Sequence, residues 1–599
     1  MHNDKPTYYH NDSVSKLDHI YSKSIGKINN IRTIITGYSD HCIILFNYNT
    51  KFDNTKPKFA FKRDKYLLTT HTLKSYIENN QNLNSIFNYE DPEIITNILT
   101  SELNLIINCI APKKRIQLTK KFAPYINKQL KAEITIKNSQ YKKYIKTKDK
   151  NDLLEFRNKR REVNHKIKQA KNAYYSKIFS NNNSKDKSDD DNIFKSNVMW
   201  KTLKDTTNTN KGGTPSNIIY EGRAINKPVD IAHIANKFYI NKVKNLRTKF
   251  KNTSYDPIDI LHRLFKKNEN KFDIPMMTIK DTKDLIKNAK YSWTVCNDEI
   301  SMMVLKKINP IISIHLNHLF NTITRTKIYP SHLKVSKIIP ILKPGKNKFE
   351  IGSYRPINIS HPIDKLYQEF VKNHLLSFLN VNNIIVKNHQ GGLKKHGTDT
   401  ALSLILNYLY INKENNKISC VLQTDLSAAY DTIDHQVLIK KLQFYGVDGD
   451  SLSIIKNYLS NRFQFVQIDT FNSSILNCLD CSVIQGSKLS SLLYILYTNE
   501  IPNLHKLIVD QNLLYCYYKL TKNKYKLLHD KIKDKCFNHL TINFIDDSTN
   551  LISYEKSDML INYLTISYDL IKEIYDINIL TINLNKTELL VSCKNVLRT

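Results

Sequence analysis

The clearest alternation of hydrophobic and polar positions lies between Leu540 and Tyr554, in LTINFIDDSTNLISY. Two apolar runs flank the acidic pair Asp546 and Asp547, and runs of this composition predict strands. Because successive side chains alternate faces along a strand, two adjacent carboxylates reach one cavity only where the backbone turns. We therefore expect a β-hairpin with the acidic pair at its turn. An isolated pair of this kind is more often a plain polar turn, since Asp favours turns for local hydrogen-bonding reasons.

A second strand is predicted in ISCVLQTDLSAAYDTID, from Ile418 to Asp434, where an apolar run ends at Asp425 and a helix-like segment follows. Asp546 follows Asp425 by 121 residues (546 minus 425), so they share a site only if their strands are neighbours in one sheet. Two Mg²⁺ ions that activate a 3′-hydroxyl and stabilise a leaving pyrophosphate need such hard carboxylate ligands, and Mn²⁺ is an alternative.

A basic hairpin is predicted from Tyr329 to Ile359, where two strand-like runs flank a turn at Lys343-Pro344-Gly345. Lys343 and Arg355 are candidates for binding a triphosphate, because the guanidinium fork suits bidentate oxygen contacts and the ammonium acts as a point charge. As isolated residues they are more often ordinary surface charges.

Four further positions carry candidate chemistry. Tyr430 stands five residues after Asp425, where its ring would lie under an incoming sugar and clash with a 2′-hydroxyl; core packing is a compatible alternative. Gly486 lets the backbone approach a ligand closely, and Gln485 offers an amide to a base or template, although Gln-Gly-Ser alone is a turn. Lys586 follows a predicted strand and is a candidate proton donor to pyrophosphate.

The region from about residue 51 to 200 is basic and mostly helical in pattern. Its clearest helix runs from Asn151 to Ser180, where an apolar stripe recurs at steps of three and four. The stripe consists of Val163, Ile167, Ala170, Tyr174 and Ile178. Basic residues occupy much of the remaining surface: Arg157, Lys159, Arg160, Arg161, Lys166, Lys168 and Lys171. Such a helix suits a phosphate backbone, and a solvated helix face is an equally good interpretation.

Composition narrows the class of protein. The chain has 599 residues, enough for several domains, and its 90 Lys and Arg against 55 Asp and Glu leave a net charge of +35. This excess favours a polyanionic partner, nucleic acid first, although AT-rich coding DNA would also enrich Lys. Of nine cysteines only Cys478 and Cys481 are close, and no second pair completes a zinc site, so we expect reduced thiols. No stretch reaches the ~18 apolar residues that span a bilayer, so an intracellular, soluble protein is expected.

Residues 1–50 contain two apolar runs that resemble the last strands of a sheet, and each delivers a polar cluster. An Asp beside a His can fix the tautomer of the imidazole, although such a pair is more often structural. The clusters resemble the closing motifs of apurinic-endonuclease-like nucleases of non-LTR retrotransposons. The matching residues are Ser15, Asp18, Ser39, Asp40 and His41. Because the metal-binding glutamate of that family would lie before Met1, the resemblance implies a remnant that does not cleave DNA by itself.

From about Asp298 to the C-terminus, seven motifs stand in one order, and together they resemble the reverse transcriptase of non-LTR (LINE-type) retrotransposons. They are YRPI at 354–357, QGGLKKHGTDTAL from 390, DLSAAYDTIDH from 425, YLSNRFQFV from 458, VIQGSKLSSLLYILYTNEIP from 483, FIDD at 544–547 and NLNKTE at 583–588.

The resemblance implies an α+β, right-hand polymerase with fingers and a palm built on an antiparallel sheet. It places Asp425, Asp546 and Asp547 at two Mg²⁺ ions. The remaining implied roles are triphosphate binding by Lys343 and Arg355, steric gating by Tyr430, contact with the nascent pair by Gln485 and Gly486, and proton donation by Lys586. Implied partners are an RNA template, a DNA primer or nicked target DNA, and deoxynucleoside triphosphates. The expected domains are the nuclease remnant 1–50, a basic helical region 51–180, a flexible linker 181–195, a helical connector 196–290 and fingers with palm 291–599.

Several positions depart from the family pattern. Ile484 stands where the family usually has Pro, Ser490-Ser491 replace Ser-Pro, and Ala428 and Ile545 replace the usual residues near the acids. A Tyr- and Lys-rich insertion is expected between Pro502 and Phe544, and the thumb is expected to be absent or truncated. These features keep a second hypothesis open, a decayed product that only binds nucleic acid. A maturase or RNA polymerase relative is a third, disfavoured by the nuclease motifs and by the bulky Tyr430.

Overall fold

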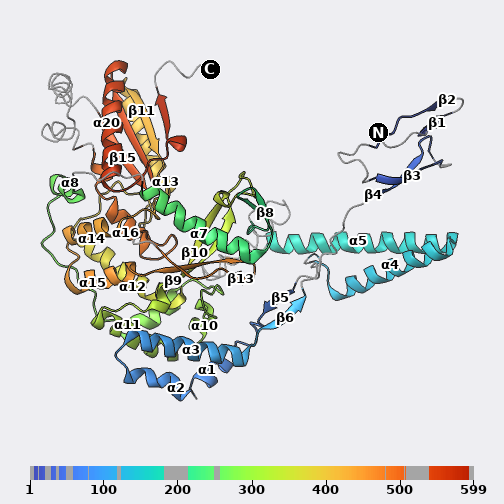
Figure 1. Ribbon diagram of the computed structural model, residues 1–599, viewed down its shortest axis with the longest axis horizontal. Helices are drawn as coiled ribbons and strands as arrows, with labels where there is room; N and C mark the ends of the chain where they lie inside the picture. The colour runs from blue at the N-terminus through green and yellow to red at the C-terminus, as the bar shows by residue number, and fades with distance from the viewer. Residues whose placement is uncertain are drawn as a thin grey trace. The chain divides into compact units, whose positions relative to one another are not determined.

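The computed structural model describes residues 6–10, 13–20, 28–35, 39–48, 59–78, 80–117, 123, 125–180, 213–248, 256–478, 481–504, 506 and 538–592 (Figure 1). The chain divides into two compact units, residues 1–62 with 114–173, and residues 63–113 with 174–599. The expected linker 181–195 and most of the expected insertion 502–544 lie outside the described residues. Within the described part of the chain, no helix is both long and apolar enough to cross a membrane. Helices and sheets are mixed, as an α+β fold requires.

The first unit contains short antiparallel ladders and two long helices. The ladders pair β1 with β2, β3 with β4 and β5 with β6. Their strands are β1 (Tyr8–His10), β2 (Ser13–Ser15), β3 (Ile28–Ile34), β4 (Ile43–Tyr48), β5 (Phe59–Lys62) and β6 (Lys114–Gln117). The apolar run after His41 therefore forms the predicted strand, β4.

The two long helices of this unit form an antiparallel pair, α4 (Lys128–Thr147) and α5 (Lys150–Ser180). Asn127 caps the start of α4 by accepting the Leu130 N–H, and Lys148 adopts a left-handed conformation that ends it. Val163 of α5 is fully buried, which agrees with the predicted apolar stripe. Ion pairs join the helices, with Lys166 Nζ 2.8 Å from Glu133 Oε1.

The second unit holds one large apolar core built mainly by helices. The contributing helices are α1 (Thr70–Glu78), α2 (Gln81–Asn84), α3 (Pro92–Ile110), α8 (Pro257–Leu264), α9 (Ile279–Asn288), α10 (Met302–Lys307), α11 (Asn309–Thr326), α12 (Pro362–Val381), α14 (His435–Phe444), α15 (Gly449–Leu459) and α16 (Ser490–Tyr497). Several begin at caps that the sequence provides. Asp91 caps α3 ahead of a proline at its first position, and Thr278 with Asp281 forms a capping box on α9.

A five-stranded sheet of the second unit contains the predicted basic hairpin. It has β9 (Val335–Leu342) paired with β10 (Tyr354–Ile359), and β12 (Phe463–Ile468) joins β9 in parallel, with β13 (Phe471–Asn472) and β14 (Leu476–Asn477) at its margin. Gly345 has a φ of 70°, which glycine adopts without strain, so the predicted turn lies where the sequence places it. Helix α7 (Pro228–Arg247) packs on β12, after the short hairpin of β7 (Ile218–Tyr220) and β8 (Arg223–Ile225).

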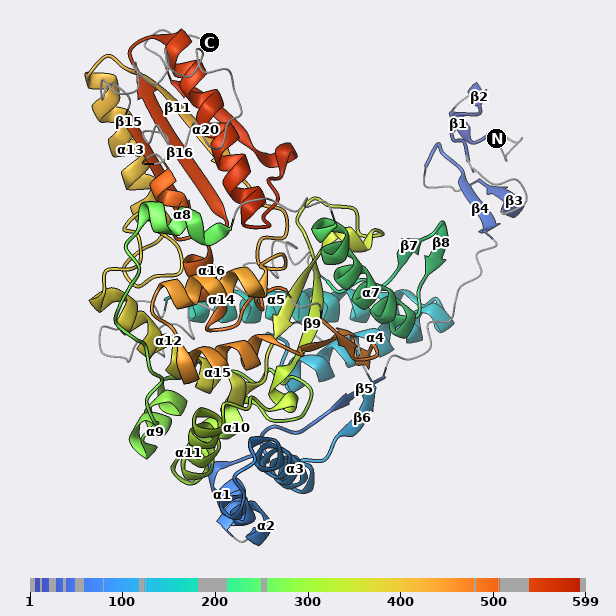
Figure 2. The same cartoon turned by 60° about the vertical axis from the view of Figure 1, so that its left-hand side comes forward.

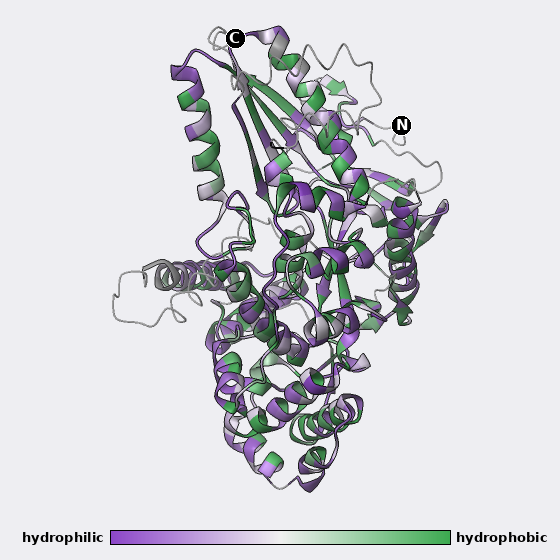
Figure 3. Cartoon of the chain, turned by 90° about the vertical axis from the view of Figure 1, so that its left-hand side faces the viewer, coloured by the Kyte–Doolittle hydropathy of each residue, from purple (hydrophilic) through white to green (hydrophobic). Residues whose placement is uncertain are grey.

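A four-stranded antiparallel sheet carries the acidic motifs, and we call it the acid-bearing sheet (Figure 2). Its order is β15 (Asn538–Phe544), β16 (Asp547–Tyr554), β11 (Ile418–Thr424) and β17 (Glu588–Ser592). Side chains alternate across it: Leu551 faces the cluster under α13 (Thr398–Glu414), whereas Ile552 joins the main core with α20 (Ser557–Ile577). Figure 3 shows hydrophobic and hydrophilic residues mixed along these strands and helices. One helix therefore covers each face of the acid-bearing sheet.

Candidate active site

The acidic pair lies at the turn of a β-hairpin, as the alternation predicted. Strand β15 pairs with β16 down to Phe544 opposite Asp547, which leaves Ile545 and Asp546 as a two-residue loop. Ile545 has a φ of 59°, the left-handed region that a β-branched residue rarely adopts. Such backbone strain persists only where the surroundings hold it.

The third acidic residue, Asp425, reaches the same end of the sheet from a distant part of the chain. Strand β11 pairs with β16 in a register that sets Thr424 opposite Ser548. The next step of this register places Asp425 opposite Asp547. The predicted neighbour relationship between the two strands is therefore confirmed, and the carboxylates of Asp425, Asp546 and Asp547 gather at one edge.

The electrostatics of this cluster penalise its negative charge. Burial raises the pKa of Asp546, and the charge of Asp425 raises it further. Burial also raises the pKa of Asp547, with added repulsion from Asp546 and Asp425. Lys586 opposes both shifts. A cluster of half-buried carboxylates that repel one another is poised to accept a cation.

Lys586 pairs directly with one of the acids. Its Nζ lies 3.0 Å from Asp425 Oδ2 and 3.2 Å from Oδ1. Asn583 also donates to Asp425 Oδ2 at 3.0 Å, and its backbone N–H donates to the Asp425 carbonyl at 2.8 Å. Both residues lie at the short helix Leu584–Lys586 that precedes β17. Sequence reasoning placed Asn583 in a motif without giving it a role, and it proves to orient Asp425.

Tyr430 faces the acids, but not from a helix. The residues after Asp425 form turns, and α14 begins only at His435, so the prediction of a helix-like segment was wrong. Hydrogen bonds across this loop explain the difference, because the Tyr430 carbonyl accepts the Val483 N–H at 2.9 Å. The Tyr430 ring stacks on Tyr494 at 4.8 Å between centroids. Burial raises the pKa of Tyr430 to about 12, with a further contribution from the charge of Asp546.

Several basic side chains act on Lys343. Burial lowers the pKa of Lys343, and the positive charges of Lys242, Arg355 and Lys586 lower it further. Lys343 follows β9, and Arg355 is exposed on β10 in register with Ile341. Lys242 belongs to α7, in a segment whose sequence pattern revealed no chemistry. Only the packing of α7 against β12 could reveal this residue.

The Gln-Gly segment forms an exposed turn. The Ser487 N–H donates to the Ile484 carbonyl at 3.1 Å, so Gln485 and Gly486 lie at the tip of this turn. Gly486 has a φ of 97°, and a Cβ atom there would lie 3.5 Å from the Asn358 carbonyl oxygen of β10. The turn therefore lies beside the basic hairpin, and its conformation favours glycine.

A second titratable cluster lies elsewhere in this unit. Side-chain atoms of Asp298, His332 and His361 lie within 4.8 Å of one another, a geometry open to a metal ion. However, the His361 Nδ1 accepts the Ile363 N–H at 3.2 Å, which leaves Nε2 to carry the proton and donate to Asp298 at 2.7 Å. Burial alone would raise the pKa of Asp298, but the neighbouring His361 and His332 lower this pKa below its ordinary value. The cluster therefore suits a buried hydrogen-bonded pair that starts α12.

The nuclease-like residues of the first unit also come together in part. His41 Nδ1 lies 2.8 Å from Asp18 Oδ2, and the His41 N–H donates to Ser39 Oγ at 3.1 Å. The hydrogen bond from His41 lowers the pKa of Asp18. Ser15 and Asp40 contribute backbone contacts, with their carbonyls accepting N–H groups of Thr7 and Tyr9. A nuclease role for these residues stays a prediction.

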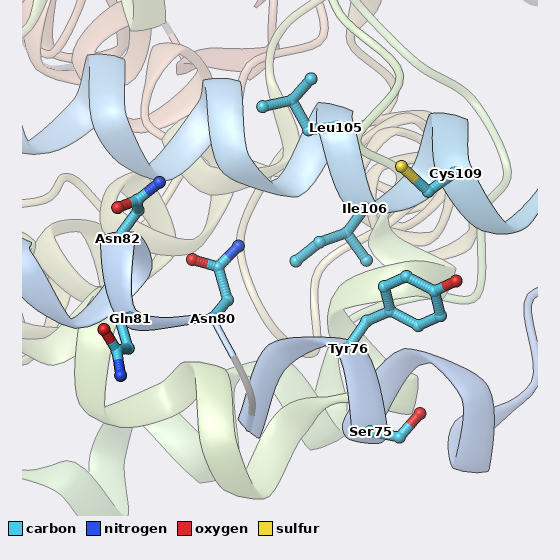
Figure 4. A pocket seen from close by; sticks show the side chains of 8 residues that line it. All are labelled: Ser75, Tyr76, Asn80, Gln81, Asn82, Leu105, Ile106 and Cys109. Carbon is cyan, nitrogen blue, oxygen red and sulfur yellow. The ribbon is translucent and has the colours of Figure 1, made fainter.

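A cavity of the second unit lies among α1, α2 and α3 (Figure 4). Tyr76 and Cys109 line it from opposite helices, together with asparagine side chains of the connecting segment. It contains none of the residues that the sequence analysis singled out.

The two cysteines nearest in sequence are both free thiols, as expected. Burial raises the pKa of Cys478 to about 11 and that of Cys481 to about 11. Raised thiol pKa values disfavour the thiolate that metal binding or nucleophilic chemistry needs.

Comparisons with known proteins match the segment of the chain that contains the acid cluster. Residues 341–597 match the family model described as reverse transcriptase (RNA-dependent DNA polymerase). The chain is 27% identical over 229 residues to the RNA-directed DNA polymerase from mobile element jockey of Drosophila funebris, covering 38% of the chain and 25% of that protein. It is 24% identical over 262 residues to the jockey polymerase of Drosophila melanogaster, covering 43% of the chain and 28% of that protein.

A longer match joins the chain to the probable RNA-directed DNA polymerase from transposon BS of Drosophila melanogaster. It is 22% identical over 478 residues and covers 78% of the chain and 50% of that protein. The chain thus spans between a quarter and half of the length of these curated relatives. Residues 341–597 of this chain are therefore similar to reverse transcriptase domains, and the relatives that share this segment are RNA-directed DNA polymerases of mobile elements.

Proposed function

We propose that the protein is an RNA-directed DNA polymerase, which adds deoxynucleotides to the 3′ end of a primer on an RNA template. The observation that carries the proposal is the gathering of Asp425, Asp546 and Asp547 on neighbouring strand ends, inside the segment that matches the reverse transcriptase family. The acid-bearing sheet serves as the palm. The sheet with the β9–β10 hairpin serves as the fingers.

The three aspartates would hold divalent ions, Mg²⁺ or alternatively Mn²⁺. The donor set fits, since it offers only carboxylate oxygens and since a bound cation would relieve the burial and repulsion that raise the pKa values of Asp546 and Asp547. When bound, two such ions activate the primer 3′-hydroxyl and stabilise the leaving pyrophosphate.

The basic residues opposite the acids would bind the triphosphate. Arg355 offers a planar fork for two phosphate oxygens, and Lys343 adds a point charge. The depressed pKa of Lys343 reflects crowding by Lys242, Arg355 and Lys586 as well as burial, and an anion among these cations would reverse that repulsion. The four cations thus form a site suited to a polyanionic ligand.

Tyr430 would select the sugar. Its ring is fixed by stacking on Tyr494 and its environment includes Asp546, so it stands between the hydrophobic core and the acids. A rigid ring at this place would clash with a ribose 2′-hydroxyl and accept deoxyribose. Gln485 and Gly486 would approach the nascent base pair from the neighbouring turn.

Lys586 would donate a proton to the pyrophosphate. In the structure its ammonium bonds both oxygens of Asp425, so this role requires Nζ to exchange that carboxylate for the leaving group. Asn583, which bonds the same carboxylate, would keep Asp425 in place during the exchange.

Primer extension tests the proposal. Purified full-length protein should extend oligo(dT) on poly(rA) with dTTP and Mg²⁺, and Asp546→Asn should abolish extension. A matched control is Asp399→Asn, which removes an exposed carboxylate near the start of α13. Loss of activity in Asp546→Asn but not in the control supports the proposal. Absence of extension by the wild type across a salt series would favour a nucleic-acid binder without turnover.

A further inference from the structure

The paired helices α4 and α5 divide their charges between two broad faces. Successive residues of an α-helix are about 100° apart around the helix axis. Measured from buried Val163, which marks the side facing α4, the exposed basic residues of α5 lie about 60° to 160° around the axis in one direction of rotation. These are Lys150, Arg157, Arg160, Arg161, Lys168 and Lys171. The three acidic residues of α5 lie about 20° to 100° round in the opposite sense. They are Asp152, Glu155 and Glu162.

Helix α4 divides its charges in the same way. Angles around the axis of α4 are measured from buried Leu130, which marks the side facing α5. The exposed residues Lys128, Lys142 and Lys146 lie about 120° to 160° from it, in the same direction of rotation as the basic residues of α5. Glu133 lies about 60° from it in the opposite direction. Contacts at both ends show that the helices run antiparallel, because the Tyr141 ring packs against Phe156 and Glu133 pairs with Lys166.

Ion pairs fix which sides of the two helices adjoin. Glu133 of α4 contacts Lys166 of α5, and Lys166 also pairs with Glu162 at 2.7 Å. The acidic sides therefore meet on one broad face, where lysines neutralise the carboxylates. By the geometry of an antiparallel pair, the basic sides meet on the other. Among the described residues, no carboxylate pairs with any of the nine cations on that face, which we call the basic face.

We infer that the basic face binds the phosphate backbone of RNA. Resting on the proposed polymerase function, this inference assigns the ligand as the template RNA. From Lys150 to Lys171 the face extends about 32 Å along α5, long enough to follow several successive phosphates. Exposed Arg and Lys at helical spacing offer no base-specific contacts, so binding should be independent of sequence and strongly dependent on salt.

The test uses the full-length chain and a labelled RNA of mixed sequence, with a DNA of the same sequence and length as a second probe. The basic-face variant carries Arg157→Gln, Arg161→Gln, Lys168→Gln and Lys171→Gln. The matched control removes four exposed lysines from the other unit, through Lys280→Gln, Lys283→Gln, Lys287→Gln and Lys290→Gln. A third variant, Arg157→Lys with Arg161→Lys, keeps the charge.

We expect the basic-face variant to bind RNA about tenfold more weakly, with the slope of log K against log salt reduced by about 3. The control and the charge-keeping variant should bind like the wild type, and circular dichroism should show equal helix content in all four proteins. At saturating poly(rA) template, kcat for primer extension should be unchanged while KM for the template rises, which separates this face from the polymerase site.

Three outcomes would overturn the inference: unchanged RNA affinity and salt slope in the basic-face variant, an equal loss in the α9 control, or lost DNA affinity with RNA affinity retained. Failure of primer extension in the wild type would count against the polymerase alone. The binding comparison needs no turnover, so the two proposals fail separately.

Discussion

A Cβ atom on Gly391 would lie 2.8 Å from the backbone nitrogen of Ile545, closer than packed atoms allow. This contact belongs to a brace between residues 388–391 and the acidic hairpin. The Gln390 N–H donates to the Asn543 carbonyl at 2.7 Å, and the Asn543 N–H donates to the Asn388 carbonyl at 3.1 Å. The brace holds the strained turn that carries Asp546, so the absence of a side chain at Gly391 has a physical cause.

Gly391→Ala should therefore displace the hairpin turn. We expect a loss of stability of about 1–3 kcal/mol. Because the carboxylate of Asp546 moves, we also expect kcat to fall by a larger factor than the factor by which KM changes. Thermal unfolding and primer extension measure the two effects. Gly213→Ala is the control, since a Cβ there meets nothing within 4 Å. Wild-type kcat in Gly391→Ala would contradict the role of the brace.

Tyr430→Ala should raise ribonucleotide incorporation. Removing the ring opens space beside the sugar, whereas Tyr430→Phe keeps the ring and should keep the selectivity. The ratio of kcat/KM for a deoxynucleotide and its ribonucleotide is the measurement. Because the ring also stacks on Tyr494, we expect Tyr430→Ala to cost about 1–3 kcal/mol of stability. An unchanged ratio in the alanine variant would refute the gate.

The raised pKa values of Asp546 and Asp547 predict a pH dependence. A carboxyl group whose pKa is higher in the folded state binds its proton more tightly when folded. Its ionisation therefore destabilises the fold as pH rises through the folded pKa, and protonation restores stability. Without metal, Asp546→Asn should raise Tm at neutral pH, by about 2 °C, and the gain should shrink as pH falls. Thermal scans across pH in chelator test this.

Magnesium should reverse the order of thermal stability of the wild type and Asp546→Asn. Because the ions need ionised carboxylates, added Mg²⁺ should raise the Tm of the wild type at neutral pH and leave Asp546→Asn nearly unchanged. The effect should fade on acidification. Equal stabilisation of both proteins would mean that Mg²⁺ binds elsewhere.

Lys586→Ala should lower kcat on the order of 100-fold if the ammonium donates a proton. Lys586→Arg keeps the ion pair with Asp425 but cannot release a proton near neutral pH, so it separates the two roles. A proton donor predicts that both variants are slow and lose the basic limb of the pH–rate profile. Full activity in Lys586→Arg would reduce Lys586 to a partner of Asp425.

His361→Ala should destabilise the fold by about 3 kcal/mol, because it leaves the buried Asp298 carboxylate with a weaker partner. A hydrogen-bonded pair predicts the same loss with and without chelator. Dependence of wild-type Tm on chelator that disappears in His361→Ala would instead indicate a metal ion. Urea unfolding under both conditions distinguishes them.

The sequence by itself determined the local features of this protein. Alternating apolar residues around Asp546 predicted the hairpin, glycine in Lys343-Pro344-Gly345 predicted the basic turn, and steps of three and four predicted α5. These succeed because strand alternation, turn geometry and helical periodicity depend on neighbouring residues. The order of motifs then indicated the family, although the family roles of the site residues stay proposals.

Tertiary structure decided which distant groups meet. Register between β11 and β16 sets Thr424 opposite Ser548, which brings the next residue, Asp425, to the end of the sheet that carries Asp547, and nothing local to either residue encodes that arrangement. Packing of α7 brings Lys242 toward Lys343, and loop hydrogen bonds replace the expected helix around Tyr430 by turns. The physical reason is that burial and long-range hydrogen bonding override local propensity, and both depend on contacts between residues far apart in the chain.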